Sequence, residues 1–271
     1  MSGEVVAAMA AGEAAGRGVM RVTLCHDGRL NAMSRAMWRQ LRSVFESIQR
    51  NADVRCVLIE GAGQAFCAGG DISEYPAFRF DPQQLRDFHE GDVWGGLAAM
   101  LACDVPIVAR IAGACMGAGV EIASCCDIRI AETGARFGAP IAKLGFPMAP
   151  REAALVARAV GDVTARQMLL EAASFSAAEM AQRGFLSRVV APERLQAEAL
   201  ASALRIAALA PAAARMNKQT LREIQVSNMP QTIVHQAQTA TDSVADPYAY
   251  ADSAEHREGI NAFLAKRAPA F

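Results

Sequence analysis

The sequence has few of the features that mark a nucleic-acid-binding or metal-binding protein. It contains no run of lysine or arginine, and its 27 basic residues nearly balance its 28 acidic ones, for a net charge of −1. A nucleic acid or an anionic membrane would favour a basic patch, so we expect neither as a partner. There is no Cys-x-x-Cys pair, and the four histidines are scattered. We therefore expect no metal site.

Segments that would direct the chain to a membrane or across it are also missing. No uncharged apolar run approaches the roughly 18–20 residues that span a bilayer. The N-terminal segment lacks a basic region and carries Glu4 and Glu13, so we expect no signal peptide. The seven cysteines are odd in number and lie mostly in apolar stretches. This usage predicts reduced, buried thiols and a cytoplasmic location.

Several common catalytic motifs are absent as well. No glycine-rich turn is followed by Gly-Lys-Ser/Thr, and none fits Gly-x-Gly-x-x-Gly, so the phosphate-binding loop and the dinucleotide fingerprint are both excluded. No Gly-x-Ser-x-Gly sequence occurs, which disfavours a serine hydrolase of that type.

The hydrophobic pattern that is present predicts an α/β fold with a helical C-terminal part. Apolar alternation or β-branched runs predict strands near 18–25, 54–60, 105–111, 127–131 and 186–190. Ser34 is placed to cap a helix, and Ser176 with Glu179 forms a capping box. Helices are predicted near 151–160, 163–172, 176–183, 193–209, 211–227 and 253–267. The Ala/Gly-rich first 18 residues are expected to be partly mobile.

Two glycine-rich turns, 61–72 and 113–127, each follow a predicted buried strand and precede a predicted helix. Glycine in such turns lets the backbone approach a ligand closely and direct its N–H groups toward it. Glu121 lies in the second turn, at the start of an apolar helix. From the local sequence alone, both turns could be purely structural, and Glu121 could be a first-turn carboxylate favoured by the helix dipole.

The two turns, taken with other segments in the same order, resemble the crotonase (enoyl-CoA hydratase/isomerase) superfamily over nearly the whole chain. The matching segments are Leu30-Asn-Ala-Met33, 61–71, 105–130, Arg136-Phe-Gly-Ala-Pro140, Leu144-Gly145, 159–161, Glu258-Gly259 and 262–271. The resemblance implies a spiral of ββα units in a core at 1–194. It also implies a helical region at 195–271 that contributes to coenzyme A (CoA) binding and to trimers or dimers of trimers.

The resemblance also implies an acyl-CoA substrate whose enolate is stabilised by an oxyanion hole. The two backbone N–H donors would be those of Gly70 and Ala118. Alanine replaces the more usual glycine at position 118 but keeps the N–H group. Glu121 occupies the first of two glutamate positions that transfer protons in the hydratases, and apolar neighbours should raise its pKa.

Contacts to CoA and the acyl group are implied at a further set of positions, and no separate cofactor is expected. These positions are Arg29, Ala32, Ala68, Asp71, Ile72, Gly117, Ile141, Phe263 and Lys266. Phe263 and Lys266 match positions that often reach CoA from a neighbouring subunit. Without the resemblance, Asp71 fits a turn or helix cap equally well, and Lys266 is a solvated helix-end cation.

The second glutamate of the hydratases is missing, because Phe137-Gly-Ala-Pro140 is followed by Ile141. Isoleucine cannot hold water, so the sequence predicts weak hydration and favours proton movement within the substrate. Glu152 is a possible substitute, although we expect an exposed residue at a helix start. Three functions remain open: a hydratase- or isomerase-like enzyme, an acyl-CoA-binding module without catalysis, and a ClpP-like peptidase. The last is disfavoured because no Ser/His pair lies at the turns.

Overall fold

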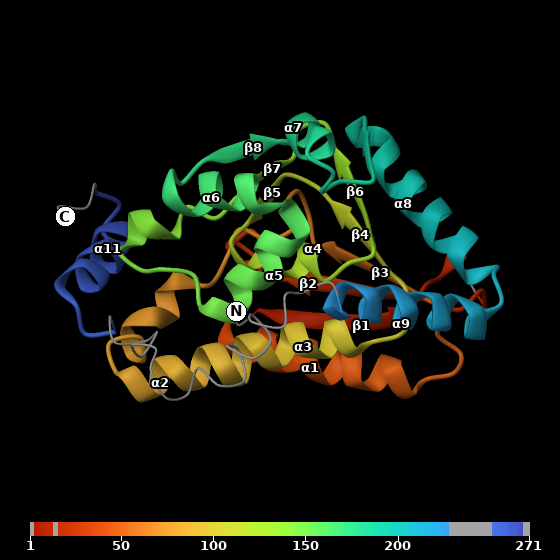
Figure 1. The fold of residues 1–271 in the computed structure, drawn as a ribbon, viewed down its shortest axis with the longest axis horizontal. Helices are drawn as coiled ribbons and strands as arrows, with labels where there is room; N and C mark the ends of the chain where they lie inside the picture. The colour runs from red at the N-terminus through yellow and green to blue at the C-terminus, as the bar shows by residue number, and fades with distance from the viewer. Residues whose placement is uncertain (1–2, 13–15, 228–250, 268–271) are drawn as a thin grey trace.

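The computed structural model describes residues 3–12, 16–227 and 251–267 (Figure 1). Its main sheet has six strands in the order β1-β2-β3-β4-β6-β9. These are β1 (Glu4–Met9), β2 (Val19–Cys25), β3 (Cys56–Gly61), β4 (Ile107–Ile111), β6 (Ile128–Glu132) and β9 (Arg188–Val190). β1 pairs antiparallel with β2, and all the other neighbours pair in parallel.

Both faces of the central strands are buried, which explains their continuous apolar sequences. On one face, Val57 and Ile59 of β3 pack into a core with α1 (Arg35–Arg50) and α3 (Trp94–Ala102). On the other face, Leu58 packs against α8 (Pro192–Ala207). Figure 1 shows α1 and α3 below the sheet and α8 along its upper right side. The core is therefore a helix–sheet–helix sandwich at this level.

A second, smaller sheet lies beside the first and includes part of the second glycine-rich turn. It consists of β5 (Ala114–Met116), β7 (Arg136–Gly138) and β8 (Ser174–Ser176), with β7 central. Helix α4 (Ala118–Ser124) follows β5 after a single residue, Gly117. This arrangement fixes where the first turn of α4 begins.

The remaining helices cover the ends of the two sheets. They are η2 (Ile72–Ala77), α2 (Pro82–Arg86), the π-helix η3 (Asp87–Val93), η4 (Ile141–Leu144), α5 (Pro150–Val160), α6 (Asp162–Leu170), α7 (Ala177–Gln182), α9 (Pro211–Ser227) and α11 (Ala254–Leu264). α11 packs on η4, where a Cβ on Gly259 would lie 2.0 Å from the Leu144 carbonyl oxygen. Only glycine permits this approach, and it brings the C-terminal helix to the end of the molecule shown on the left in Figure 1.

The predicted strands and helices are confirmed, and one further strand of the main sheet was not predicted. Residues 4–9 form the edge strand β1, paired with β2 from Glu4 to Met9, and this backbone pairing explains a strand built from small side chains. The partial mobility expected for the first 18 residues stays a prediction. Ser34 accepts a hydrogen bond from Met37 N–H, and the Ser176–Glu179 capping box is formed. All seven cysteines are free thiols, six of them buried.

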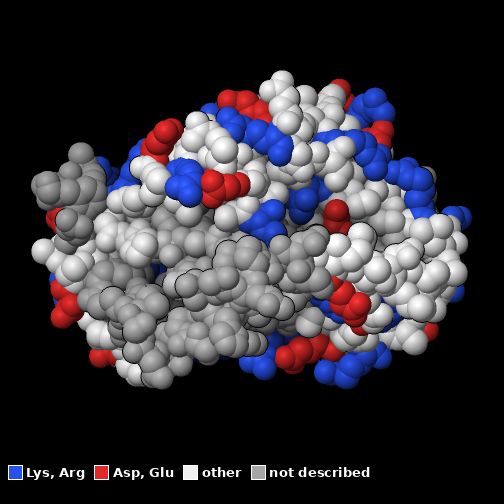
Figure 2. Space-filling view, in the orientation of Figure 1, with Lys and Arg blue, Asp and Glu red and all other residues white. Residues whose placement is uncertain are grey.

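Figure 2 shows basic and acidic side chains interspersed on the face in view. Among the described residues, no single helix is long and apolar enough to cross a bilayer. α8 and α9, bent by 103° to one another, meet that test only as a pair and only by length and composition. The division into a core at 1–194 and a region at 195–271 stays a prediction, and residues 228–250 and 268–271 lie outside the described residues.

Candidate active site

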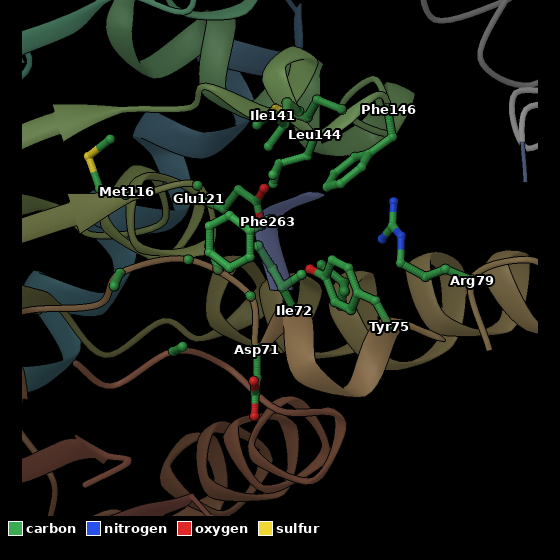
Figure 3. Close-up of a pocket in the computed structure, with 18 of the residues that line it drawn as sticks. Asp71, Ile72, Tyr75, Arg79, Met116, Glu121, Ile141, Leu144, Phe146 and Phe263 are labelled. Atoms are coloured by element: carbon green, nitrogen blue, oxygen red, sulfur yellow. The ribbon is translucent and has the colours of Figure 1, made fainter. Parts of the chain in front are cut away.

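One cavity of about 340 Å³ gathers residues from both glycine-rich turns and from α11 (Figure 3). Gly70, Gly117, Ala118 and Glu121 all line it. So does Phe263 of the C-terminal helix of the same chain. A pocket of this kind, mostly apolar with a few convergent polar groups, is the usual form of a small-molecule site.

Backbone hydrogen bonds hold the two turns against each other. The Cys67 N–H donates to Ala114 O at 2.9 Å, and the Met116 N–H donates to Cys67 O at 2.9 Å. A Cβ on Gly119 would lie 2.5 Å from that same Cys67 oxygen, so the second turn can approach this closely only with glycine there. Gly117 has φ +47°, a left-handed conformation that also favours glycine. The paired turns thus place Gly70 and Ala118 on one cavity.

The backbone geometry around Gly70 and Ala118 determines the direction of their N–H groups. Met33 N–H donates to Gly69 O, and Asp71 N–H donates to Met33 O. Since backbone polar groups alternate in direction along an extended segment, the N–H of Gly70 between them points away from Met33. Ala118 is the first residue of α4, where N–H groups have no acceptor within the helix.

Glu121 lies one turn into α4 and is 6% exposed. In Figure 3 its carboxyl group points into the cavity, toward the apolar side chains of Ile141 and Leu144. Burial raises the pKa of Glu121 well above its usual value, and the charge of Glu152 raises that pKa further. A carboxyl group with a raised pKa can hold or release a proton near neutral pH.

Five residues assigned to CoA contacts also line the cavity: Arg29 and Ala32 of the loop near 30–33, and Ala68, Asp71 and Ile72 of the first turn. Asp71 is the N-cap of η2, and its side chain accepts a hydrogen bond from Ser73 N–H. It also lies 3.4 Å from the Arg29 guanidinium, whose side chain is 51% exposed at the cavity mouth. Arg29 therefore presents a cation at the entrance, held by a buried carboxylate.

The two C-terminal candidates differ in position. Phe263 lines the cavity and, in Figure 3, lies in front of Glu121. Lys266 follows the end of α11, has φ +53°, is exposed, and does not line the cavity. Within one chain, only the phenylalanine is brought to the site.

Comparison with known proteins identifies the family of this arrangement. The family described as enoyl-CoA hydratase/isomerase matches residues 14–271. The chain belongs to that family. It is 31% identical over 250 residues to a probable enoyl-CoA hydratase of Mycobacterium bovis, covering 92% of this chain and 93% of that protein.

Solved structures of the enoyl-CoA hydratase/isomerase family share the fold. An enoyl-CoA hydratase/carnithine racemase from Magnetospirillum magneticum superposes with a TM-score of 0.75 at 34% identity, covering 94% of this chain and 92% of that one. An enoyl-CoA hydratase/isomerase from Pseudoalteromonas atlantica gives 0.78 at 28% identity, with 99% of each chain covered. The crotonase fold is confirmed, and family membership supports an acyl-CoA-processing enzyme of the hydratase/isomerase type.

The enoyl-CoA hydratase/isomerase cavity also contains residues that the sequence did not single out. Tyr75 of η2, Arg79 of the turn that follows η2, and His89 of η3 line it together with Glu152. A Cβ on Gly70 would lie 2.1 Å from the Tyr75 hydroxyl oxygen, which places this hydroxyl beside the proposed donor. These residues are recognised because they are buried close together in the structure, and no sequence motif points to them.

The expectation that Glu152 is exposed is wrong. Glu152 is 4% exposed, because the first turn of α5 faces inward onto α4 and the cavity. Burial is the largest cause that raises the pKa of Glu152 above its usual value, and nearby Glu90 also raises it, whereas Arg79 lowers it. Besides Asp71 of the first turn, the cavity is therefore lined by two buried carboxyl groups, Glu121 and Glu152.

The raised pKa of Glu121 predicts a pH-dependent loss of stability. Between the ordinary glutamate pKa and its raised folded value, the folded state binds a proton that the unfolded state has released, so stability falls as pH rises. Glu121→Gln removes this effect. The prediction is tested by thermal unfolding of the wild type and of Glu121→Gln at pH 5 and at pH 9. At pH 5 the two proteins should have similar Tm values. At pH 9 the variant should be more stable, by about 1.4 kcal/mol per unit of pKa shift.

Exposed Glu171 on the end of α6 provides the matched control, since Glu171→Gln should give no such gain at pH 9. Equal Tm values for wild type and Glu121→Gln at pH 9 would contradict a buried, destabilising carboxylate at position 121.

Proposed function

We propose that the protein binds an acyl-CoA thioester and stabilises its enolate, with the Gly70 and Ala118 N–H groups as oxyanion hole and Glu121 as general acid/base. One observation carries the proposal: Glu121 is buried in the same cavity as both donors, one helical turn after Ala118. Preorganised N–H groups act most strongly where water is excluded. A proton-transferring group near the thioester carbonyl is suited to the adjacent α-carbon.

The apolar wall opposite the turns favours a shift of a double bond over addition of water. Ile141, Leu144 and Phe146 line the cavity where a second glutamate would follow Pro140 in a hydratase. None of these side chains can hold a water molecule for attack. The reaction supported best is therefore proton transfer between carbons of an enoyl-CoA.

The binding mode that we propose places CoA along the loop near 30–33 and the first turn, at Arg29, Ala32, Ala68, Asp71 and Ile72. The exposed Arg29 guanidinium would meet phosphate groups of CoA. CoA enters as part of the substrate. Gly117 and Ile141 would contact the acyl group, and Phe263 would close the cavity over it. We also propose a trimer or dimer of trimers, in which Lys266 reaches CoA in a neighbouring subunit; sedimentation at micromolar concentration tests the assembly.

A binding module without catalysis is the second candidate, favoured by Ile141. Against it stands the burial of Glu121, because an isolated buried carboxyl group lowers stability and has no evident use in a passive pocket. The two candidates differ in whether any bond to hydrogen in the acyl group is broken.

Incubation with a panel of 2-enoyl- and 3-enoyl-CoA thioesters, followed by mass analysis and separation of isomers, tests the proposal. We expect a mass-neutral shift of the double bond to exceed addition of water. Ile141→Glu should raise the hydration of crotonyl-CoA. No conversion of any thioester, or efficient hydration by the wild type at well above about 10³ per second, would contradict the proposed reaction.

A further inference from the structure

A chain of buried polar side chains leads from the cavity into the protein behind Glu152. His89 Nδ1 lies 2.7 Å from Glu152 Oε1, and His89 Nε2 lies 3.3 Å from Arg79 Nη1. Arg79 in turn donates from Nε to His256 Nε2 of α11, at 3.2 Å. Arg79 is fully buried, with its guanidinium 4.1 Å from the centre of the Phe146 ring.

Arg79 determines the direction of the hydrogen bonds among these side chains. Its guanidinium donates and cannot accept, so the His89 Nε2 that faces it must accept. The proton of a neutral His89 is therefore on Nδ1, and it donates to Glu152 Oε1. Burial, followed by the charge of Arg79, lowers the pKa of His89, which keeps it neutral. His89 thus acts on Glu152 as a fixed donor and not as a cation.

These contacts stabilise the ionised form of one carboxyl group more than that of the other. Glu152 faces the donor His89, the charge of Arg79 and a hydrogen bond from the Ala149 backbone, all of which stabilise its ionised form. Glu121 points at apolar side chains. Burial raises the pKa of Glu152 to about 8 and that of Glu121 well above its usual value. Because Glu152 has these stabilising contacts and Glu121 does not, Glu152 ionises first as the pH rises and Glu121 keeps its proton.

A structural role explains part of this arrangement but not all of it. Glu152 is in the first turn of α5, and its bond from Ala149 caps that helix. A cap of this kind works equally well when exposed to solvent. It does not require burial in the ligand cavity, electrostatic contact with Glu121, or a buried histidine that holds one oxygen in place.

We propose that Glu152 is a second proton-transferring carboxylate of this cavity, acting on the acyl chain beyond the α-carbon, with His89 as its positioning residue. The proposal rests on the enolate chemistry proposed above. With a 2-enoyl thioester, the Glu152 carboxylate removes a proton from the γ-carbon. The C–H electron pair forms the β,γ double bond, and the α,β electrons move into the enolate held by Gly70 and Ala118.

Glu121 then gives its proton to the α-carbon, so that a C–H bond breaks at the γ-carbon, one forms at the α-carbon, and nothing is oxidised or reduced. After this step Glu121 has lost one proton and Glu152 has gained one. The reverse reaction, or exchange with water, restores both groups. The missing glutamate at position 141 then does not prevent the reaction, because Glu152 of α5 supplies the second carboxyl group.

Glu152→Gln tests this assignment with little change in shape, since the glutamine oxygen still accepts from His89 and from Ala149. Two rates are measured for each variant: hydrogen exchange at the α-carbon of butyryl-CoA in ²H₂O, and interconversion of 2- and 3-hexenoyl-CoA. We expect the ratio of exchange to interconversion to rise at least about 10²-fold in Glu152→Gln. Exposed Glu171→Gln should leave the ratio unchanged.

Interconversion by Glu152→Gln at the wild-type rate, or an equal loss of both rates in a folded variant, overturns the role of Glu152 while leaving the enolate proposal intact. Absence of both reactions in the wild type refutes the enolate proposal instead.

His89 variants separate positioning from packing. In His89→Asn the amide can still donate to Glu152, whereas His89→Phe cannot donate. Loss of the donor raises the pKa of Glu152, which faces Arg79, Glu90 and Glu121 as its other charged neighbours. The acid limb of the interconversion pH profile should move to higher pH in His89→Phe but not in His89→Asn. Equal profiles for the two variants overturn the role of His89.

Discussion

Glu121→Gln is expected to lower kcat for enoyl-CoA interconversion by about 10²–10⁴-fold. Glutamine fits the same space on α4 and retains hydrogen-bonding atoms, but it can neither take up nor release a proton at neutral pH. Such a loss corresponds to about 3–5 kcal/mol of transition-state stabilisation. It should appear in kcat, because in the proposed binding mode Glu121 acts on the acyl group, whereas CoA is held by other residues, among them the exposed Arg29.

Calorimetric binding of a saturated acyl-CoA provides the control for Glu121→Gln, and its Kd should stay within a few fold of the wild-type value. Full turnover by a folded variant would sink the assignment of Glu121. A parallel loss of binding would indicate a role in substrate placement instead.

Gly70→Pro should abolish measurable turnover. Proline has no backbone N–H, so the substitution deletes one of the two donors to the enolate oxygen. Removal of one such donor costs about 10²–10³-fold in kcat at comparable sites. The ring also has to fit where a Cβ would already meet the Tyr75 hydroxyl at 2.1 Å, which adds a displacement of that side chain.

Gly70→Ala separates these two effects, because alanine keeps the N–H and only displaces Tyr75. We expect it to fold and to retain more activity than the proline variant, measured as kcat on the same enoyl-CoA. Equal activity of Gly70→Pro and wild type would exclude Gly70 as a donor.

The glycine-rich turns could be located from the sequence because their function depends on local backbone geometry. Gly117 needs a positive φ, and Gly119 lies where any side chain would strike Cys67 O. Such requirements restrict these positions to glycine, so they can be recognised in the sequence. The same holds for Ser34 and Ser176, whose capping bonds span only three residues.

The second half of the site could not be predicted, because its contacts are distant in sequence and follow no motif. His89 and Glu152 are 63 residues apart, and Arg79 and His256 are 177 apart. His89 also lies in a π-helix, whose spacing of side chains a search for the usual helical period does not anticipate. Glu152 was expected to be exposed because a charged residue after Pro150 and Arg151 at a helix start usually is. Only the packing of α5 on α4 turns it inward.

Hydrogen exchange at the α-carbon of a saturated acyl-CoA in ²H₂O, measured by NMR or mass analysis from neutral to alkaline pD so that the ionised form of Glu121 is populated, tests the enolate assignment most directly. No double bond and no added water are involved, so the measurement isolates removal of the α-proton. We expect exchange by the wild type that falls by at least about 10²-fold in Glu121→Gln. Absence of exchange in the wild type, with the thioester bound in the cavity, would contradict it.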